Sequence, residues 1–103
     1  MRLPARMLTT TAQVLTATRT PAGLGQTTTT WTAGESVPAA HYPAGEKVLR
    51  AAQLLKVQVS REAYLQGSID LSPLDHRLIL DGVTYQITLV DEYKGFTVVG
   101  LVT

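Results

Sequence analysis

Hydrophobic and polar residues alternate with a period of two at several places along the chain, which is the pattern of β-strands that bury one face. The clearest case lies near the C-terminal end, where two alternating segments, residues 77–80 and 83–90, flank the pair Asp81-Gly82. An Asp-Gly pair supplies the positive φ angles that a two-residue type I′ turn requires. We therefore predict a tight hairpin whose structural turn is formed by Asp81 and Gly82.

Pairing across this turn places Leu80 opposite Val83 and Leu78 opposite Tyr85. All four side chains share one face, which Ile87 and Leu89 continue, so we expect the hairpin to be buried on that side. After a second turn, residues 96–103 form another segment rich in β-branched side chains. The C-terminal part is thus predicted to be a three-strand meander, the smallest sheet that holds together beside other elements.

The first half of the chain is rich in threonine, whose branched side chain favours a strand over a helix. We predict strands over residues 10–18 and 26–32, joined by a loop at 19–25 that contains one proline and two glycines. Residues 35–42 contain Pro38 and precede a further proline. Because proline donates no backbone hydrogen bond, we expect this segment to be at best an edge strand or an extended crossover.

The middle of the chain contains one helical pattern. In residues 45–55 apolar side chains recur every three or four positions, which predicts a short helix. Residues 56–62 alternate cleanly and are predicted as a strand, and residues 66–73 as a loop. The predicted fold is all-β: a small single-domain β-barrel or sandwich of about six short strands spanning residues 1–103. Residues 39–56 are predicted to form a long loop with a short helix inserted between strands.

Composition narrows the class of protein. The chain has 103 residues, of which 45% are hydrophobic and 17% charged, and its net charge is +1. Soluble domains usually have about 25% charged residues, so more of this surface is free to be buried against neighbours. The absence of cysteine excludes disulfides, thiolate catalysis and cysteine-based zinc sites. The N-terminal residues lack the apolar core of a secretory signal, and no apolar run approaches the ~20 residues of a membrane span. We expect a soluble protein made in a cytoplasm.

No arrangement of side chains in the sequence predicts catalysis. His76 follows Asp75, but neighbouring residues on a strand point to opposite faces, so this carboxylate is poorly placed to orient the imidazole. His41 lies in a proline-flanked segment and is interpreted as a surface or interface residue. The two histidines have no metal-ligand spacing, and Gly23 and Gly25 lack the lysine that follows a phosphate loop. We predict that the chain is not an enzyme and has no catalytic, metal or cofactor site.

A loose basic grouping is formed by Lys47, Arg50, Lys56 and Arg61. Such a grouping usually marks a solvated helix face, but these side chains would meet phosphates if the segment lined a pore. Trp31 lies in a threonine-rich segment and is interpreted as a core or interface anchor. No second aromatic residue accompanies it at the spacing that a base-stacking sheet uses.

Several short motifs follow one another in the second half of the chain, and their order is a more specific basis for comparison with protein families than any single motif. The residues concerned are Gln53, Ile69-Asp70-Leu71-Ser72, Asp75, Arg77, Asp81-Gly82, Tyr85 and Ile87. In this order they resemble the head-completion, or head-to-tail stopper and joining, proteins of long-tailed bacteriophages. The first half has a similar outline, with a glycine loop and then a tryptophan-containing strand. His76 departs from the pattern, because the family often has Asp and Arg in direct succession.

This resemblance implies a small β-barrel that joins its own copies in a cyclic ring beneath the portal and adaptor proteins. Such a ring lies at the head–tail interface of the virion, after assembly in the host cytoplasm, and requires neither an enzyme activity nor a membrane. It helps to retain packaged double-stranded DNA in the channel and provides the docking surface for the tail terminator or tail tube protein. By the same resemblance, residues 39–56 are expected to reach toward the channel, with Lys47, Arg50 and Lys56 as its phosphate contacts.

Three alternatives remain beside the stopper. A tail-completion or adaptor protein of the same connector can share this pattern, although adaptors are usually more helical. A nucleic-acid-binding barrel of the OB type would need exposed aromatic side chains and a basic groove. A small enzyme would need a cluster of polar side chains that converge on one site.

Overall fold

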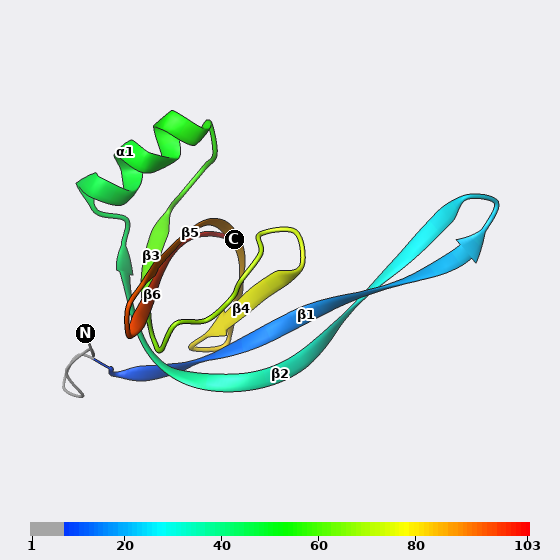
Figure 1. Ribbon diagram of the computed structural model, residues 1–103, viewed down its shortest axis with the longest axis horizontal. Helices are drawn as coiled ribbons and strands as arrows, with labels where there is room; N and C mark the ends of the chain where they lie inside the picture. The colour runs from blue at the N-terminus through cyan, green and yellow to red at the C-terminus, as the bar shows by residue number, and fades with distance from the viewer. Residues whose placement is uncertain (1–7) are drawn as a thin grey trace.

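A closed antiparallel barrel is formed by the six strands of the computed structural model, which describes residues 8–103 (Figure 1). The elements are β1 (Thr10–Gly23), β2 (Gln26–Pro43), α1 (Glu46–Leu55), β3 (Arg61–Gln66), β4 (His76–Leu80), β5 (Val83–Tyr93) and β6 (Phe96–Val102). Around the barrel the strand order is β1-β2-β3-β6-β5-β4, and β4 pairs back onto β1. The predicted all-β fold with one short helix is confirmed.

The barrel interior is filled by alternate residues of the strands, as period-two patterning requires. Its fully buried side chains are mostly aliphatic and include Leu65, Leu78, Leu80, Val99 and Leu101. Thr97 is the polar exception among the described residues. Its hydroxyl donates to the carbonyl oxygen of Gly67 at 2.9 Å and accepts from the Ile69 N–H at 3.0 Å. A buried hydroxyl thus keeps its hydrogen bonds and fixes the start of the loop between β3 and β4.

The pairing in the C-terminal meander matches the prediction, but two side chains of its predicted buried face do not face the core. Val83 is 42% exposed, and Leu89 lies on the outer face because the pairing of β5 with β6 shifts register between Ile87 and Leu89. Leu80 pairs with Val83 and Leu78 with Tyr85, and the two turn residues have positive φ angles, 51° at Asp81 and 81° at Gly82. These are the angles of a type I′ turn.

The first hairpin is longer than predicted, and the loop predicted at residues 19–25 is wrong. β1 and β2 stay paired up to Gly23 and Gln26, so that only Leu24 and Gly25 form the turn. β1 pairs with β4 only as far as Thr16. Beyond that point β1 has a free edge, and a free edge tolerates the proline that suggested a loop.

The end of β2 also corrects the prediction of an edge strand or crossover. Ala39 pairs with Thr10 of β1 on one side and with Leu65 of β3 on the other, so β2 is an interior strand here. Pro38 lies one residue before the pairing with β3 begins, and Pro43 is the last paired residue. Both prolines therefore stand where a missing N–H is tolerated. Residues 39–43 belong to the barrel, so the expected insertion begins after them.

The strand predicted at residues 56–62 is wrong in its first part, since β3 begins only at Arg61. Lys56 takes a left-handed conformation with a φ angle of 57°, and its N–H caps the carbonyl ends of α1. Val57 and Val59 remain half-buried and pack at the end of β6. A Cβ atom at Gly100 would lie 2.8 Å from a methyl carbon of Val59, so glycine lets this segment approach the strand.

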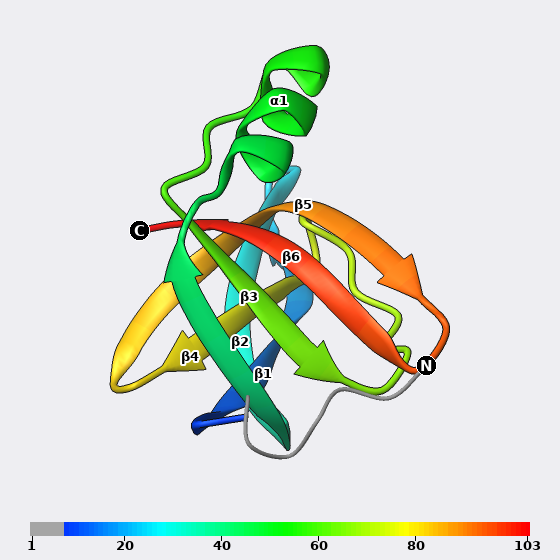
Figure 2. The same cartoon turned by 90° about the vertical axis from the view of Figure 1, so that its left-hand side faces the viewer.

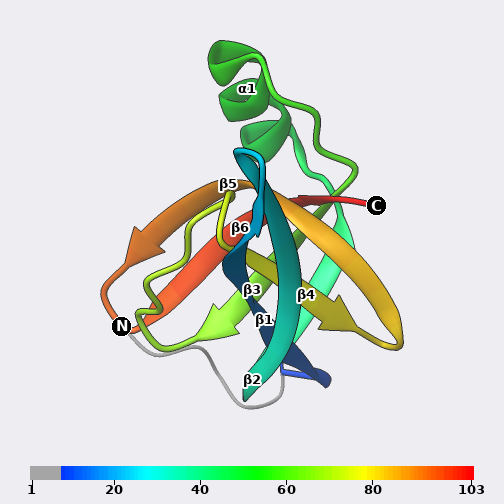
Figure 3. The same cartoon turned by 90° about the vertical axis from the view of Figure 1, so that its right-hand side faces the viewer.

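The far part of the first hairpin projects from the barrel as a two-stranded ribbon (Figure 1), which points toward the viewer in Figure 3. We call residues 18–30 the arm. Every residue of the arm is exposed, and the arm accounts for the long shape of the molecule, whose extents are 49 × 30 × 25 Å. The helix α1 stands outside the barrel, above the end of β6 (Figure 2).

Candidate functional site

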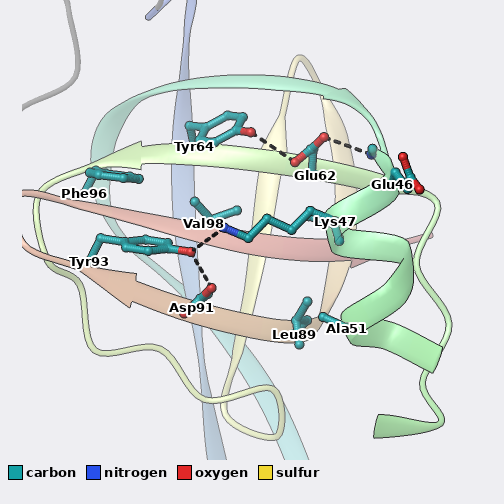
Figure 4. A pocket seen from close by; sticks show the side chains of 12 residues that line it. Glu46, Lys47, Ala51, Glu62, Tyr64, Leu89, Asp91, Tyr93, Phe96 and Val98 are labelled. Atoms are coloured by element: carbon teal, nitrogen blue, oxygen red, sulfur yellow. Dashed lines mark hydrogen bonds between the residues drawn. The ribbon is translucent and has the colours of Figure 1, made fainter. Parts of the chain in front are cut away.

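A cavity of about 400 Å³ separates α1 from the outer face of the barrel (Figure 4). Strands β3, β5 and β6 supply its floor, because the side chains that alternate with the core residues point outward here. The lining residues are Gly45, Glu46, Lys47, Val48, Ala51, Glu62, Tyr64, Leu89, Asp91, Tyr93, Phe96 and Val98. This cavity combines an apolar floor with a few charged side chains.

Within the cavity, a series of hydrogen bonds connects α1 to β5. The Lys47 ammonium donates to the Tyr93 hydroxyl at 3.4 Å, and this hydroxyl donates to Asp91 at 2.7 Å (Figure 4). The Tyr93 ring stacks on Phe96 with 4.8 Å between the ring centroids. Lys47 therefore already has an aromatic and acidic environment within its own chain.

A second set of polar contacts in the cavity lies at the start of α1. Gly45 precedes α1 and has no side chain to cap it, and the carboxylate of Glu62 accepts from the Gly45 N–H at 2.9 Å instead. A negative charge at this end of a helix is also stabilised by the helix dipole. The other carboxylate oxygen of Glu62 accepts from the Tyr64 hydroxyl at 3.2 Å. Burial, followed by the charge of Glu62, raises the pKa of Tyr64 above its ordinary value of 10.0.

A second cluster of titratable side chains joins four parts of the barrel. The Arg61 Nε–H donates to His41 Nδ1 at 3.0 Å, so Nδ1 carries no proton and Nε2–H donates to Asp81 at 2.7 Å. Thr10 donates to the other carboxylate oxygen of Asp81, also at 2.7 Å. The hydrogen bonds from His41 and then Thr10 hold the pKa of Asp81 below its ordinary value of 3.8.

This arrangement stabilises the barrel and does not resemble a catalytic pair. A general base needs a ring nitrogen that is free to take a proton from a substrate, but both nitrogens of His41 are engaged. His41 is half-buried, with its side chain 14% exposed, so it does not lie open on the surface; its interpretation as an interface residue stays a prediction. Asp81 has its predicted place in the turn, and its carboxylate also joins the turn to β1 and β2 by hydrogen bonds.

A third cluster fixes the base of the arm. Arg19 pairs with Asp75 at 2.5 Å and also donates to the Leu74 carbonyl oxygen at 2.8 Å. Next to it, the Arg77 guanidinium lies over the Trp31 ring, 4.1 Å from its centroid. The loop after β3 and the start of β4 thus contact both strands of the hairpin where it leaves the barrel.

His76 has a different role from Asp75 and Arg77, the residues on either side of it. Its Nδ1 accepts from the Ser72 N–H at 2.9 Å, and its own N–H donates to the Ser72 carbonyl oxygen at the same distance. It therefore shapes the loop that leads into β4. Asp75 turns to Arg19 instead, as expected from the opposite directions of adjacent side chains.

The basic side chains expected to meet DNA lie in different environments. Lys47 faces Tyr93, Arg50 forms an ion pair with Glu46 one helical turn earlier, and Lys56 ends the helix. Arg61, which the sequence grouped with them, belongs to the His41 cluster. The contact of Lys47, Arg50 and Lys56 with phosphate stays a prediction.

Within residues 8–103, no group of three or more histidine or acidic side chains could hold a metal ion. Across the same residues, no helix is long and apolar enough to span a membrane.

Comparison with known proteins adds no relative. No protein-family model matches the chain, and no curated protein is significantly similar to it. The connector hypothesis therefore stays a proposal, which the geometry of the described residues can support and experiments can test.

Proposed function

We propose that the chain is a structural subunit of a bacteriophage head–tail connector. Its copies form a ring below the portal and adaptor, close the filled head, help to retain DNA and provide the surface to which the tail attaches. The observation that carries this proposal is the arm, a long ribbon that is uncharged over residues 20–30 and that no other part of residues 8–103 covers. The order of the motifs in residues 48–90 supports the same function.

The arm is a surface suited to burial against another protein. Residues 20–30 contain no ionisable side chain, and both edges of the ribbon are open, since β4 pairs only up to Thr16 and β3 only from Ala39. An isolated two-stranded hairpin is marginally stable in water, and an open strand edge readily pairs with another chain. A partner that covers the arm would thus stabilise it, which is what a ring of subunits provides.

The base of the arm is arranged so that its direction is set before any partner binds. The Arg19–Asp75 pair and the stacking of Arg77 on Trp31 hold both strands at the barrel surface. A binding element that is already oriented loses less conformational entropy on association. This favours an assembly role for the arm over that of a flexible loop.

The cavity below α1 argues against the alternative of an OB-type nucleic-acid-binding barrel. Such a barrel needs exposed aromatic rings beside a basic groove. Here Tyr64, Tyr93 and Phe96 lie under the helix, and they share the cavity with the carboxylates of Glu62 and Asp91. These negative charges repel phosphate.

In the proposed ring, α1 faces the channel and its basic side chains contact the DNA. The test replaces Lys47, Arg50 and Lys56 together by Gln in the virus that encodes the chain, with Lys94→Gln in the β5–β6 turn as the matched control. We expect filled heads that carry the triple variant to lose DNA, while the control heads keep it. Equal retention in both would refute the channel-facing role of α1, and rings that never form on the portal would refute the connector function itself.

A further inference from the structure

A second surface of the chain has the same character as the arm. It is a groove of about 350 Å³ between α1, the segment that follows it and the end of β6. The lining residues are Leu49, Ala52, Gln53, Val57, Gln58, Val59, Ser60 and Val102. None of them is ionisable, so the groove matches residues 20–30 of the arm in lacking charge. Leu54 and Leu55 extend the apolar surface beside it, at 85% and 60% exposed.

The groove also contains a segment whose sequence has the pattern of a strand but which joins the sheet only at its last residue. Residues 56–60 alternate polar and apolar side chains, yet β3 begins only at Arg61. Within residues 8–103, one backbone hydrogen bond joins this segment to a barrel strand, from the Ser60 N–H to the Leu101 carbonyl oxygen at 2.8 Å. Val59 is seated against Gly100 of β6, which holds the segment in place. The N–H groups of Lys56 and Val57 bond back to the end of α1, so Gln58 and Val59 are the residues with which an open strand edge from another molecule would pair.

The tip of the arm is shaped to enter such a groove. Leu24 lies in the turn between Gly23 and Gly25 and is fully exposed. The arm projects about 20 Å beyond the barrel at the rise of an antiparallel strand. It points away from α1 (Figure 1), so its own groove is out of reach.

We infer that the arm of one copy of this chain docks in the groove between α1 and β6 of the next copy, with Leu24 inserted beside Leu49 and Val57. The inference rests on the proposed function, because it names the contact by which the subunits of the ring join. Two different surfaces of one chain then meet, so the contact is head-to-tail, and a head-to-tail contact closes into a ring or continues as a filament. A specific interface uses roughly 20–30 residues on each side, of which the arm alone would supply about half.

The chain contains no cysteine, so single introduced thiols can report which surfaces meet. A Leu24→Cys chain and a Gln53→Cys chain are mixed at about 1 mM, where an association with a Kd of about 1 mM is still partly populated. A short bis-maleimide then links neighbouring thiols. Leu74→Cys replaces Leu24→Cys in the matched control, because Leu74 is also strongly exposed, at 78% against 102% for Leu24, and lies outside both residues 18–30 and the groove.

The head-to-tail contact predicts a covalent dimer from the mixture and a ladder of larger products from the chain that carries both Leu24→Cys and Gln53→Cys. Either single variant alone and the Leu74 control should give little product. No dimer from the mixture, or as much from the control, would overturn the inference. If rings with portal still form in that case, the connector function stands and only the docking of the arm is wrong.

Discussion

Gly82→Val tests whether the Asp81-Gly82 turn sets the register of the C-terminal meander. Gly82 has a φ angle of +81°, and a Cβ atom built there would have no heavy atom within 4 Å. The substitution thus introduces no clash, and its effect is the strain of a β-branched residue in a left-handed conformation. That strain is on the order of 1–3 kcal/mol.

A loss of this size is large for a small domain, whose free energy of unfolding is about 5–15 kcal/mol. In a domain of this length each kcal/mol shifts the melting temperature by roughly 4–8 °C. We expect thermal melting, followed by circular dichroism, to show a fall of about 4 °C or more for Gly82→Val. Gly82→Asn is the matched control, because asparagine tolerates the left-handed region and should lose much less stability.

The reasoning would be refuted if Gly82→Val melted with the parent chain, or if Gly82→Asn were equally destabilised. In the first case the turn does not require the observed φ angle. In the second case the loss of stability has a cause other than the left-handed backbone conformation of Gly82.

Three further predictions concern the clusters around the barrel. Because hydrogen bonds lower the pKa of Asp81 in the folded state, its contribution to stability is present above its ordinary pKa of 3.8 and is lost as the pH falls through the folded value. Melting curves of the parent and Asp81→Asn should differ near neutral pH and converge in strong acid, and a constant gap would contradict this. Because the pKa of Tyr64 is raised, one tyrosine should ionise late in an ultraviolet pH titration, and Glu62→Gln should bring it earlier; an unchanged titration would contradict the assignment. In Gly45→Ala the new Cβ would come within 2.8 Å of Glu62 Oε1, so the carboxylate must leave the Gly45 N–H, and chemical denaturation should show a loss of about 1 kcal/mol. If both changes break the same hydrogen bond, the double variant Gly45→Ala/Glu62→Gln should lose little more stability than Glu62→Gln alone. A loss equal to the sum of the two single losses would argue against this.

The parts of the fold that follow from local patterns could be predicted from the sequence. The Asp81-Gly82 turn and the alternation on both sides of it determine the meander, because a two-residue turn fixes the register of its strands. The helix over residues 45–55 likewise follows from its own apolar period. In both cases the interacting residues are neighbours in the sequence.

The parts that depend on distant partners could not be predicted in this way. Pro21 and Gly23 favour a loop when only the local sequence is considered. They can lie in β1 because the strand has a free edge there, and the local sequence does not show that edge. Residues 56–60 alternate like a strand, but alternation does not show whether a neighbouring strand exists.

The side-chain clusters are formed by residues far apart in the chain. Arg19 and Asp75 are 56 positions apart, and His41 and Asp81 are 40 positions apart. No short motif contains either pair. His41 could be located in the sequence as a candidate but not assigned to a partner, and Arg19 carried no signal beyond its charge.

The most direct test of the proposed connector function is to image the purified chain together with the portal and adaptor proteins of the proposed connector. We expect a closed ring of added density below the portal in negative-stain images, and loss of that ring when the arm is shortened by removing residues 20–30. Portal complexes that never bind the chain, together with salt-sensitive binding of free single-stranded DNA by the chain alone, would contradict it and favour the nucleic-acid-binding barrel.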